Sequence, residues 1–162
     1  MQQPTFTRGW PYTPVPGRSA GRAALAERKA ALSRAPLFAA LSKRHLLTVA
    51  RIAGAWTYAE EATLVKEGDP GSTFFVLVEG RVRVVRGKRT VGRLSEGDFF
   101  GEISLLDPGP RTATVIAESP ITCIELTGQD FHEVLAREPS IGTAILRVLA
   151  RRVREAERPL VG

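Results

Sequence analysis

The sequence of 162 residues contains only one cysteine and two histidines. The single cysteine, Cys123, excludes an internal disulfide, and its place in the apolar run ITCIEL predicts a small buried side chain. His45 and His132 stand apart from any cysteine ligand pattern or nucleophile motif, so we expect packing or surface roles for both. The acidic residues form no paired arrangement. The sequence therefore predicts neither a bound metal nor a catalytic centre, and not an enzyme.

Long apolar runs are also missing. No segment approaches the ~18 apolar residues that a membrane helix needs, and the N-terminus lacks the apolar core of a secretory signal. We therefore expect no transmembrane segment and a cytoplasmic location. Hydrophobic residues still make up 43% of the chain, which is enough for one ordinary domain with a buried core.

Acidic residues are scarce at the front of the chain. Residues 1–54 carry nine Lys and Arg against one acid, whereas the remainder carries fourteen against sixteen, so the net charge of +6 comes from the front. A second basic cluster lies near the end, at Arg147, Arg151, Arg152, Arg154 and Arg158. Such patches suit nucleic acid, an anionic membrane or an acidic partner, and equally a solvated helix face. No DNA-reading element accompanies them, so no specific DNA binding is expected.

Proline density separates the first segment from the rest. Residues 1–20 contain four prolines, which predicts a proline-rich arm without helix, suited to docking on the domain or on another protein. Residues 21–54 form an N-terminal helical segment, with helices predicted over 22–34 and 43–53. Pro36 ends the first of these helices and Gly54 the second.

Residues 55–127 change to a period of two, which is typical of strands. The strands are predicted at 56–58, 63–66, 73–78, 81–86, 90–94, 113–117 and 121–126. Many short strands at even spacing predict a small antiparallel barrel or jelly roll. Residues 128–162 return to helix, with helices predicted over 129–137 and 140–157.

The segment 100–115, FGEISLLDPGPRTATV, carries the chemistry of the chain. Gly101 permits close approach of the main chain, and residues 102–106 are predicted to form one or two helical turns whose first N–H groups suit a phosphate. Arg111 adds a forked donor that can hold two phosphate oxygens. A phosphate would repel Glu102, so we expect this carboxylate to accept a hydroxyl proton from an attached sugar. The pattern indicates a nucleotide site.

This segment resembles the phosphate-binding cassette of cyclic nucleotide-binding domains, the type found in the catabolite activator and in the regulatory subunit of protein kinase A. The resemblance covers roughly residues 35–157. It implies a mainly β fold with flanking helices: a double-stranded β-helix (jelly-roll) barrel with N-terminal helices and a C-terminal lid helix. It also implies a cyclic nucleotide as the ligand, cAMP before cGMP, and no metal.

The resemblance assigns roles to individual residues. The main chain around the glycine and the small residue binds the cyclic phosphate in the family, which implies Gly101, Ile103 and Ser104 here. Glu102 would hold the ribose 2′-hydroxyl and Arg111 the equatorial phosphate oxygen, with Thr112 beside the phosphate or the base. An ion pair between Arg111 and an acid such as Glu102 is the structural alternative.

The walls of the base pocket and the lid follow from the same resemblance. Alignment implies that Val84, Val91 and Val115 line the base pocket, and an ordinary role in the barrel core is the alternative for all three. In the family, the last helix folds over the base. The residues for this here are Leu146, Leu149, Val153 and Arg152, although the same stripe would also suit a dimer seam or core packing.

The sequence predicts a stand-alone, bacterial-type sensor or adaptor. Bacterial relatives often join this domain to a helix-turn-helix reader, and the single helix predicted after residue 137 is too short for one. We expect the signal to pass to a protein partner through the N-terminal arm or the C-terminal helices, and a homodimer is left open. The alternatives are a scaffold or assembly subunit with weak or no nucleotide binding, and a regulatory fragment of a larger channel or enzyme.

Overall fold

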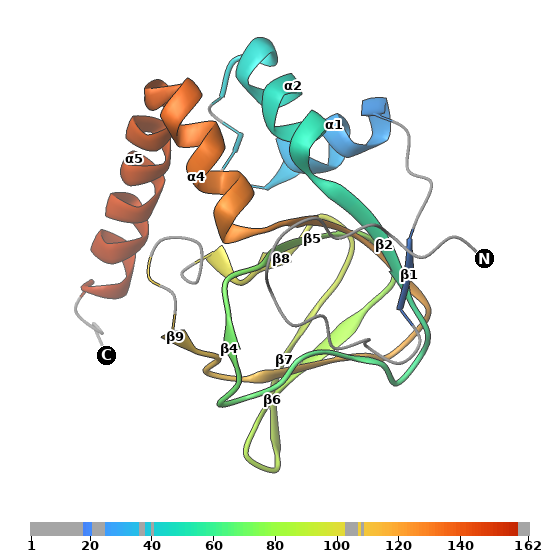
Figure 1. The fold of residues 1–162 in the computed structure, drawn as a ribbon. Helices are drawn as coiled ribbons and strands as arrows, with labels where there is room; N and C mark the ends of the chain where they lie inside the picture. Colours follow the sequence, from blue (N-terminus) through green and yellow to red (C-terminus); the bar gives the residue numbers. More distant parts are fainter. Residues whose placement is uncertain are drawn as a thin grey trace.

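Two antiparallel sheets face each other in the computed structural model, which describes residues 18–20, 25–35, 38–39, 41–102, 107 and 109–158 (Figure 1). The first sheet has the strand order β1-β2-β11-β5-β8 and the second β3-β10-β6-β7, while β4 and β9 form a short ribbon. The strands are β1 (Arg18–Ala20), β2 (Gly54–Tyr58), β3 (Thr63–Val65), β4 (Pro70–Gly71), β5 (Phe74–Glu79), β6 (Val82–Arg86), β7 (Arg89–Leu94), β8 (Phe99–Phe100), β9 (Gly109–Pro110), β10 (Thr114–Ala117) and β11 (Ile121–Leu126).

Successive side chains of a strand point to opposite faces, and this divides the core into two clusters. Along β5, Phe75 and Leu77 point between the sheets, where they join Trp56, Val82 and Val115. Phe74 and Val76 point the other way, toward the helices. Because both faces of β5 are buried, its sequence reads as a continuous apolar run rather than as alternation.

The helices cover the outer face of the first sheet (Figure 1). They are α1 (Leu25–Arg34), α2 (Lys43–Ile52), α4 (Gly128–Arg137) and α5 (Pro139–Ala156). The hydroxyl of Ser42 caps α2 by accepting from the His45 N–H at 3.2 Å, and Thr127 caps α4 in the same way. Pro139 begins α5 at a position where a missing N–H does no harm.

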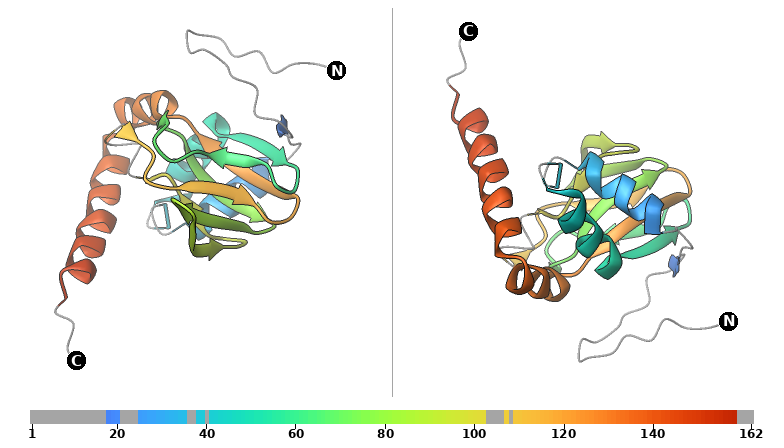
Figure 2. Two further views of the ribbon diagram at one scale, coloured as in Figure 1. Left: turned by 90° about the horizontal axis from the view of Figure 1, so that it is seen from below. Right: turned by 90° about the horizontal axis from the view of Figure 1, so that it is seen from above.

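Helix α5 leaves this layer and extends past the barrel (Figure 2). Its first half is anchored by Ile141 and Ile145, which are buried in the helix-side core. Beyond them Leu149 is half-buried, whereas Leu146 is 65% exposed and Val153 is 54% exposed. The side chain of Arg152 lies outside what the structure describes. None of the described helices is long and apolar enough to cross a membrane.

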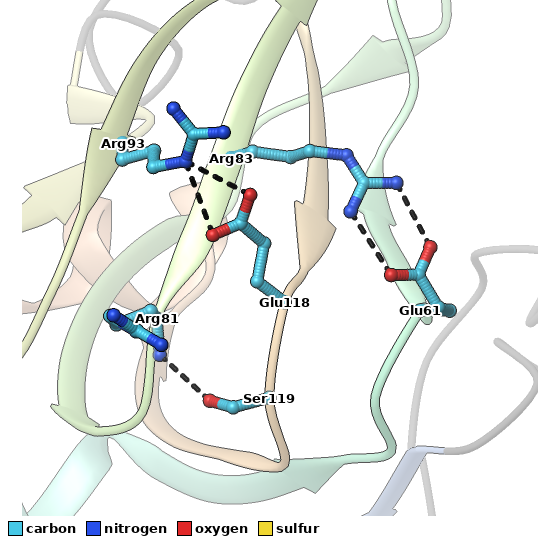
Figure 3. Close-up of polar contacts among 6 residues, drawn as sticks. All are labelled: Glu61, Arg81, Arg83, Arg93, Glu118 and Ser119. Atoms are coloured by element: carbon cyan, nitrogen blue, oxygen red, sulfur yellow. Dashed lines mark hydrogen bonds and ion pairs between the residues drawn. The ribbon is translucent and has the colours of Figure 1, made fainter.

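A polar network covers the outer face of the second sheet (Figure 3). Arg83 and Arg93 stand opposite each other on β6 and β7, an arrangement of like charges that destabilises a hairpin. Each is paired with a carboxylate: Arg83 donates twice to Glu61, at 2.9 and 3.1 Å, and Arg93 donates to Glu118 at 3.0 Å. The hydrogen bond from Arg83 lowers the pKa of the Glu61 carboxyl. The two acids thus offset the repulsion within the hairpin.

The structure confirms a mainly β jelly-roll fold with flanking helices. The seven predicted strands and four predicted helices are present, each within about three residues of its predicted ends. Four short strands, β1, β4, β8 and β9, were not predicted, because two or three residues carry no recognisable period. Residues 1–17 of the predicted arm lie outside the described residues, as do 103–106 of the predicted cassette helix.

Cys123 lies in the core between the sheets, where its side chain is fully buried, as predicted. Its thiol is 3.8 Å from Oε2 of Glu125, which also accepts a hydrogen bond from the Tyr58 hydroxyl at 2.9 Å. Glu125 is itself buried, and such a carboxylate needs polar partners of this kind.

Candidate functional site

A cavity of about 420 Å³ opens between the barrel and the segment that begins at Phe100. Strands β3, β6 and β10 form one wall, and the main chain around Gly101 and Gly109 forms another. Among the described residues, the cavity is lined by Val65, Val84, Arg86, Phe100, Gly101, Glu102, Asp107, Gly109, Pro110, Arg111, Thr112, Ala113 and Val115. The volume is in the range of small-molecule sites in proteins.

Arg111 is fixed in the cavity wall by its main chain and by its side chain. Its N–H donates to the carbonyl of Asp69 and its own carbonyl accepts from the Gly68 N–H, both at 2.8 Å. The guanidinium donates from Nη2 to the carbonyl of Thr73 at 3.1 Å, and its Cζ lies 6.0 Å from the centre of the Phe75 ring. Burial lowers the pKa of this guanidinium, which nevertheless remains protonated at neutral pH. The site therefore contains a pre-positioned, half-buried cation.

Two glycines lie directly against that guanidinium. Gly101 has a φ of +85°, and a Cβ on it would lie 2.5 Å from the Thr73 carbonyl oxygen and 3.1 Å from Nη1 of Arg111. A Cβ on Gly71 would lie 2.5 Å from Nε of Arg111. Only glycine fits such a conformation and such an approach without displacing its neighbours. The fold thus brings Gly101 and Arg111 together although they are ten residues apart in the sequence.

The other predicted residues are placed around this pair. Glu102 is half-buried and Thr112 is exposed, and both line the cavity. Val84 and Val115 are direct cross-strand partners on β6 and β10 and line the same cavity. A cation and bare main chain beside a carboxylate and an apolar wall can hold a small ligand that is anionic at one point and apolar elsewhere.

Val91 is not among the residues that line the cavity; its side chain is 54% exposed. The register of β6 with β7 explains this placement. Val84 pairs with Gly92 and Val85 pairs with Thr90, so Val91 is an extra residue in a β-bulge. A strict period of two through this hairpin would give Val91 a direct partner on β6, and the bulge removes that pairing. The structure therefore does not support a role for Val91 in the pocket wall. Ile103 and Ser104 lie outside the described residues.

Sequence reasoning missed several residues that shape the cavity. Thr73, Phe75 and Gly71 position Arg111, and Arg86 contributes a second cation to the lining. Phe100 lines the cavity and stacks on Phe75 with ring centres 4.5 Å apart. Its position directly before Gly101 is the one sequence feature that points to Phe100. The others depend on strand register, which the sequence alone does not fix.

Neither a metal-ligand cluster nor a contact between α5 and the cavity is found among the described residues. These residues contain no group of three or more His, Cys, Asp or Glu side chains arranged to hold a metal ion. No residue of α5 is among those that line the cavity, so the predicted lid residues Leu146, Leu149 and Val153 are not in contact with it in this structure.

The chain is similar to known proteins over the barrel and its adjoining helices. The profile of the family described as "Cyclic nucleotide-binding domain" matches residues 55–138. A "CRP-like cAMP-activated global transcriptional regulator" of Mycobacterium tuberculosis is 32% identical over 104 residues, which are 60% of this chain and 46% of that protein. The chain therefore matches less than half the length of this relative.

Two solved structures share the fold. The N-terminal domain of a transcriptional regulator from Streptomyces coelicolor has a TM-score of 0.74 and 36% identity, covering 78% of this chain and 92% of that one. The Thermus thermophilus Catabolite Activator Protein has a TM-score of 0.66 and 31% identity, covering 75% of this chain and 60% of that one.

Proposed function

The chain belongs to the cyclic nucleotide-binding domain family, and we propose that it is a sensor that binds cAMP, with cGMP as the second choice, in the 420 Å³ cavity. The observation that carries this proposal is the close approach of Gly101 to Arg111, where a Cβ on Gly101 would lie 3.1 Å from Nη1, because it sets main chain without a side chain beside a cation, as a phosphate requires. The Mycobacterium relative is described as cAMP-activated, which favours cAMP here.

Each side chain then has a task that its chemistry suits. Arg111 pairs with an oxygen of the cyclic phosphate, which lies against the main chain of Gly101. The Glu102 carboxylate accepts a hydrogen bond from the ribose 2′-hydroxyl. Thr112 donates a hydrogen bond to the phosphate or the base at the rim of the cavity. Val84 and Val115 contact the base. Ile103 and Ser104 complete the phosphate cradle through their main chain.

Binding becomes a signal if it changes the position of a helix. The apolar side chains of Leu146 and Val153 are exposed on α5, and burying them over the ligand would favour a second position of that helix. The protein then acts as an adaptor that reports the nucleotide to a partner protein through its N-terminal arm or its C-terminal helices. The proposal assigns no catalytic step to the chain.

Ligand-dependent stability tests this proposal against the scaffold alternative. At 100 times its Kd, cAMP is expected to stabilise the folded protein by about 2.7 kcal/mol, which raises the Tm by roughly 5–10 °C for a chain of this size. Thermal unfolding is measured with cAMP, cGMP, linear AMP and no ligand. The scaffold interpretation requires the same Tm in all four samples, whereas equal shifts with linear and cyclic AMP would contradict a site shaped for a cyclic phosphate.

A further inference from the structure

The hairpin of β6 and β7 brings a second arginine to the cavity. Residues 81–94 contain six Lys and Arg and no acid. Four of these cations, Arg81, Lys88, Arg89 and Arg93, do not line the cavity, and neither does Arg83, which is paired with Glu61. Arg86 is the exception, since it lines the cavity together with Val84. One of the six cations of this hairpin therefore lies at the ligand cavity, whereas the other five do not line it.

The position of Arg86 follows from strand register. The inward residues of β6 go from the fully buried Val82 through the half-buried Val84 to the exposed Arg86, as the barrel opens toward the cavity. The ladder with β10 runs from Val82 opposite Ala117 to Val85 opposite Thr114. Arg86 is the next residue of β6 and so lies beside the residues that come directly after Arg111. In the proposed site, Arg111 marks the end of the cavity that binds the phosphate.

A second cation at this place is unfavourable for the hairpin itself. Arg86 is directly opposite Arg89, and like charges in that relation destabilise an antiparallel pair. On the outer face the same arrangement of Arg83 and Arg93 is offset by Glu61 and Glu118. Within the described residues, neither Arg86 nor Arg89 forms an ion pair. An anionic ligand can supply the stabilising partner that this cation lacks among the described residues.

Hydrogen bonds of Glu67 connect the tip of the hairpin to the loop that holds Arg111. Oε2 of Glu67 accepts the Gly87 N–H at 2.8 Å, and the Glu67 N–H donates to Oγ1 of Thr114 at 2.9 Å. The next two residues, Gly68 and Asp69, make the main-chain hydrogen bonds to Arg111. Glu67 thus connects the turn that follows Arg86 to the Thr114 side chain, and its two neighbours in the sequence hold the main chain of Arg111.

We propose that Arg86 is a second phosphate-binding residue, which meets the cyclic phosphate from the hairpin side while Arg111 holds it from the loop side, and that Glu67 positions the hairpin for this contact. The assignment rests on the proposed function, because it requires the cyclic nucleotide to occupy this cavity. It adds to that function a direct contact from a strand outside the segment 100–115.

The matched pair Arg86→Gln and Arg89→Gln tests the inference. Both substitutions remove one positive charge from cross-strand neighbours, but only Arg86 lines the cavity. Titration calorimetry measures the Kd for cAMP. Arg86→Gln is expected to raise this Kd roughly tenfold, because it removes one charge-assisted hydrogen bond. Arg89→Gln is expected to change the Kd by less than about twofold at physiological salt, where exposed charges are screened.

The positioning role of Glu67 is tested by a double-mutant cycle. Glu67→Ala is expected to raise the Kd by roughly threefold in the wild-type background and to have no further effect in Arg86→Gln, because the two changes remove one contact. Full additivity of the two changes would overturn the positioning role.

The outcomes separate this inference from the proposed function. If the wild-type protein binds cAMP and Arg86→Gln binds equally well, or if Arg86→Gln and Arg89→Gln weaken binding equally, Arg86 makes no direct contact and the inference is wrong while the proposed function stands. If the wild-type protein binds no cyclic nucleotide, both are wrong.

Discussion

Replacing Arg111 by lysine is expected to raise the Kd for cAMP by at least about 30-fold, equivalent to about 2 kcal/mol. The guanidinium is already positioned by the Thr73 carbonyl and the Phe75 ring, so it can meet a phosphate with little reorganisation. A lysine ammonium has no planar fork and cannot donate to Thr73 and to a phosphate in the same geometry. Titration calorimetry at constant salt measures the change.

Arg93→Lys is the matched control for this substitution. Arg93 is also held by an acceptor, Glu118, but it lies on the outer face of the second sheet and does not line the cavity. We expect the Arg93→Lys variant to bind cAMP with the same affinity as the wild-type protein. Circular dichroism should show an intact fold in both variants. Binding of cAMP by Arg111→Lys with the wild-type Kd would mean that the guanidinium does not hold the ligand.

Replacing Gly101 by alanine is expected to destabilise the protein by about 2–4 kcal/mol and to abolish measurable binding of cAMP. The left-handed φ of +85° is strained for alanine, and the new Cβ would meet the Thr73 carbonyl oxygen at 2.5 Å. Because Thr73 belongs to the main chain that enters β5, it cannot move aside without disturbing the core. Urea unfolding measures the loss of stability.

Gly92→Ala controls for the effect of an added methyl group. Gly92 lies in β7 with no heavy atom within 4 Å of its ideal Cβ and without a positive φ. Its substitution should change stability by less than about 0.5 kcal/mol, as is usual for a site without strain. Equal stability of Gly101→Ala and Gly92→Ala would contradict the close contact between Gly101 and the main chain of Thr73.

The sequence predicted the architecture well because its signals are local. The glycine that follows α2, the proline at the start of α5 and the alternation in β6 each act within a few residues. The motif at 100–115 likewise predicted that Gly101 and Arg111 belong to one site. In the structure a Cβ on Gly101 would lie 3.1 Å from Nη1 of Arg111, so the two residues are neighbours, while their roles toward a nucleotide stay predictions.

What the sequence did not reveal depends on register and on long-range contact. The bulge in β7 changes the direction of the Val91 side chain, and although Gly92 in the run RTVGRL is compatible with a bulge, the sequence does not fix which residue is the extra one. Thr73 and Gly71 meet Arg111 only because the loops before β5 and β10 lie side by side. Arg86 appears in the sequence as one more cation of a basic hairpin, and only the pairing of β6 with β10 places it at the cavity.

A crystal structure of the protein with cAMP would test the central claim most directly. The account predicts the cyclic phosphate within about 3 Å of the Arg111 guanidinium, lying against the main chain of Gly101, with the base packed against Val84 and Val115. A nucleotide bound elsewhere, or one whose phosphate points to solvent while Arg111 contacts only the protein, would contradict it.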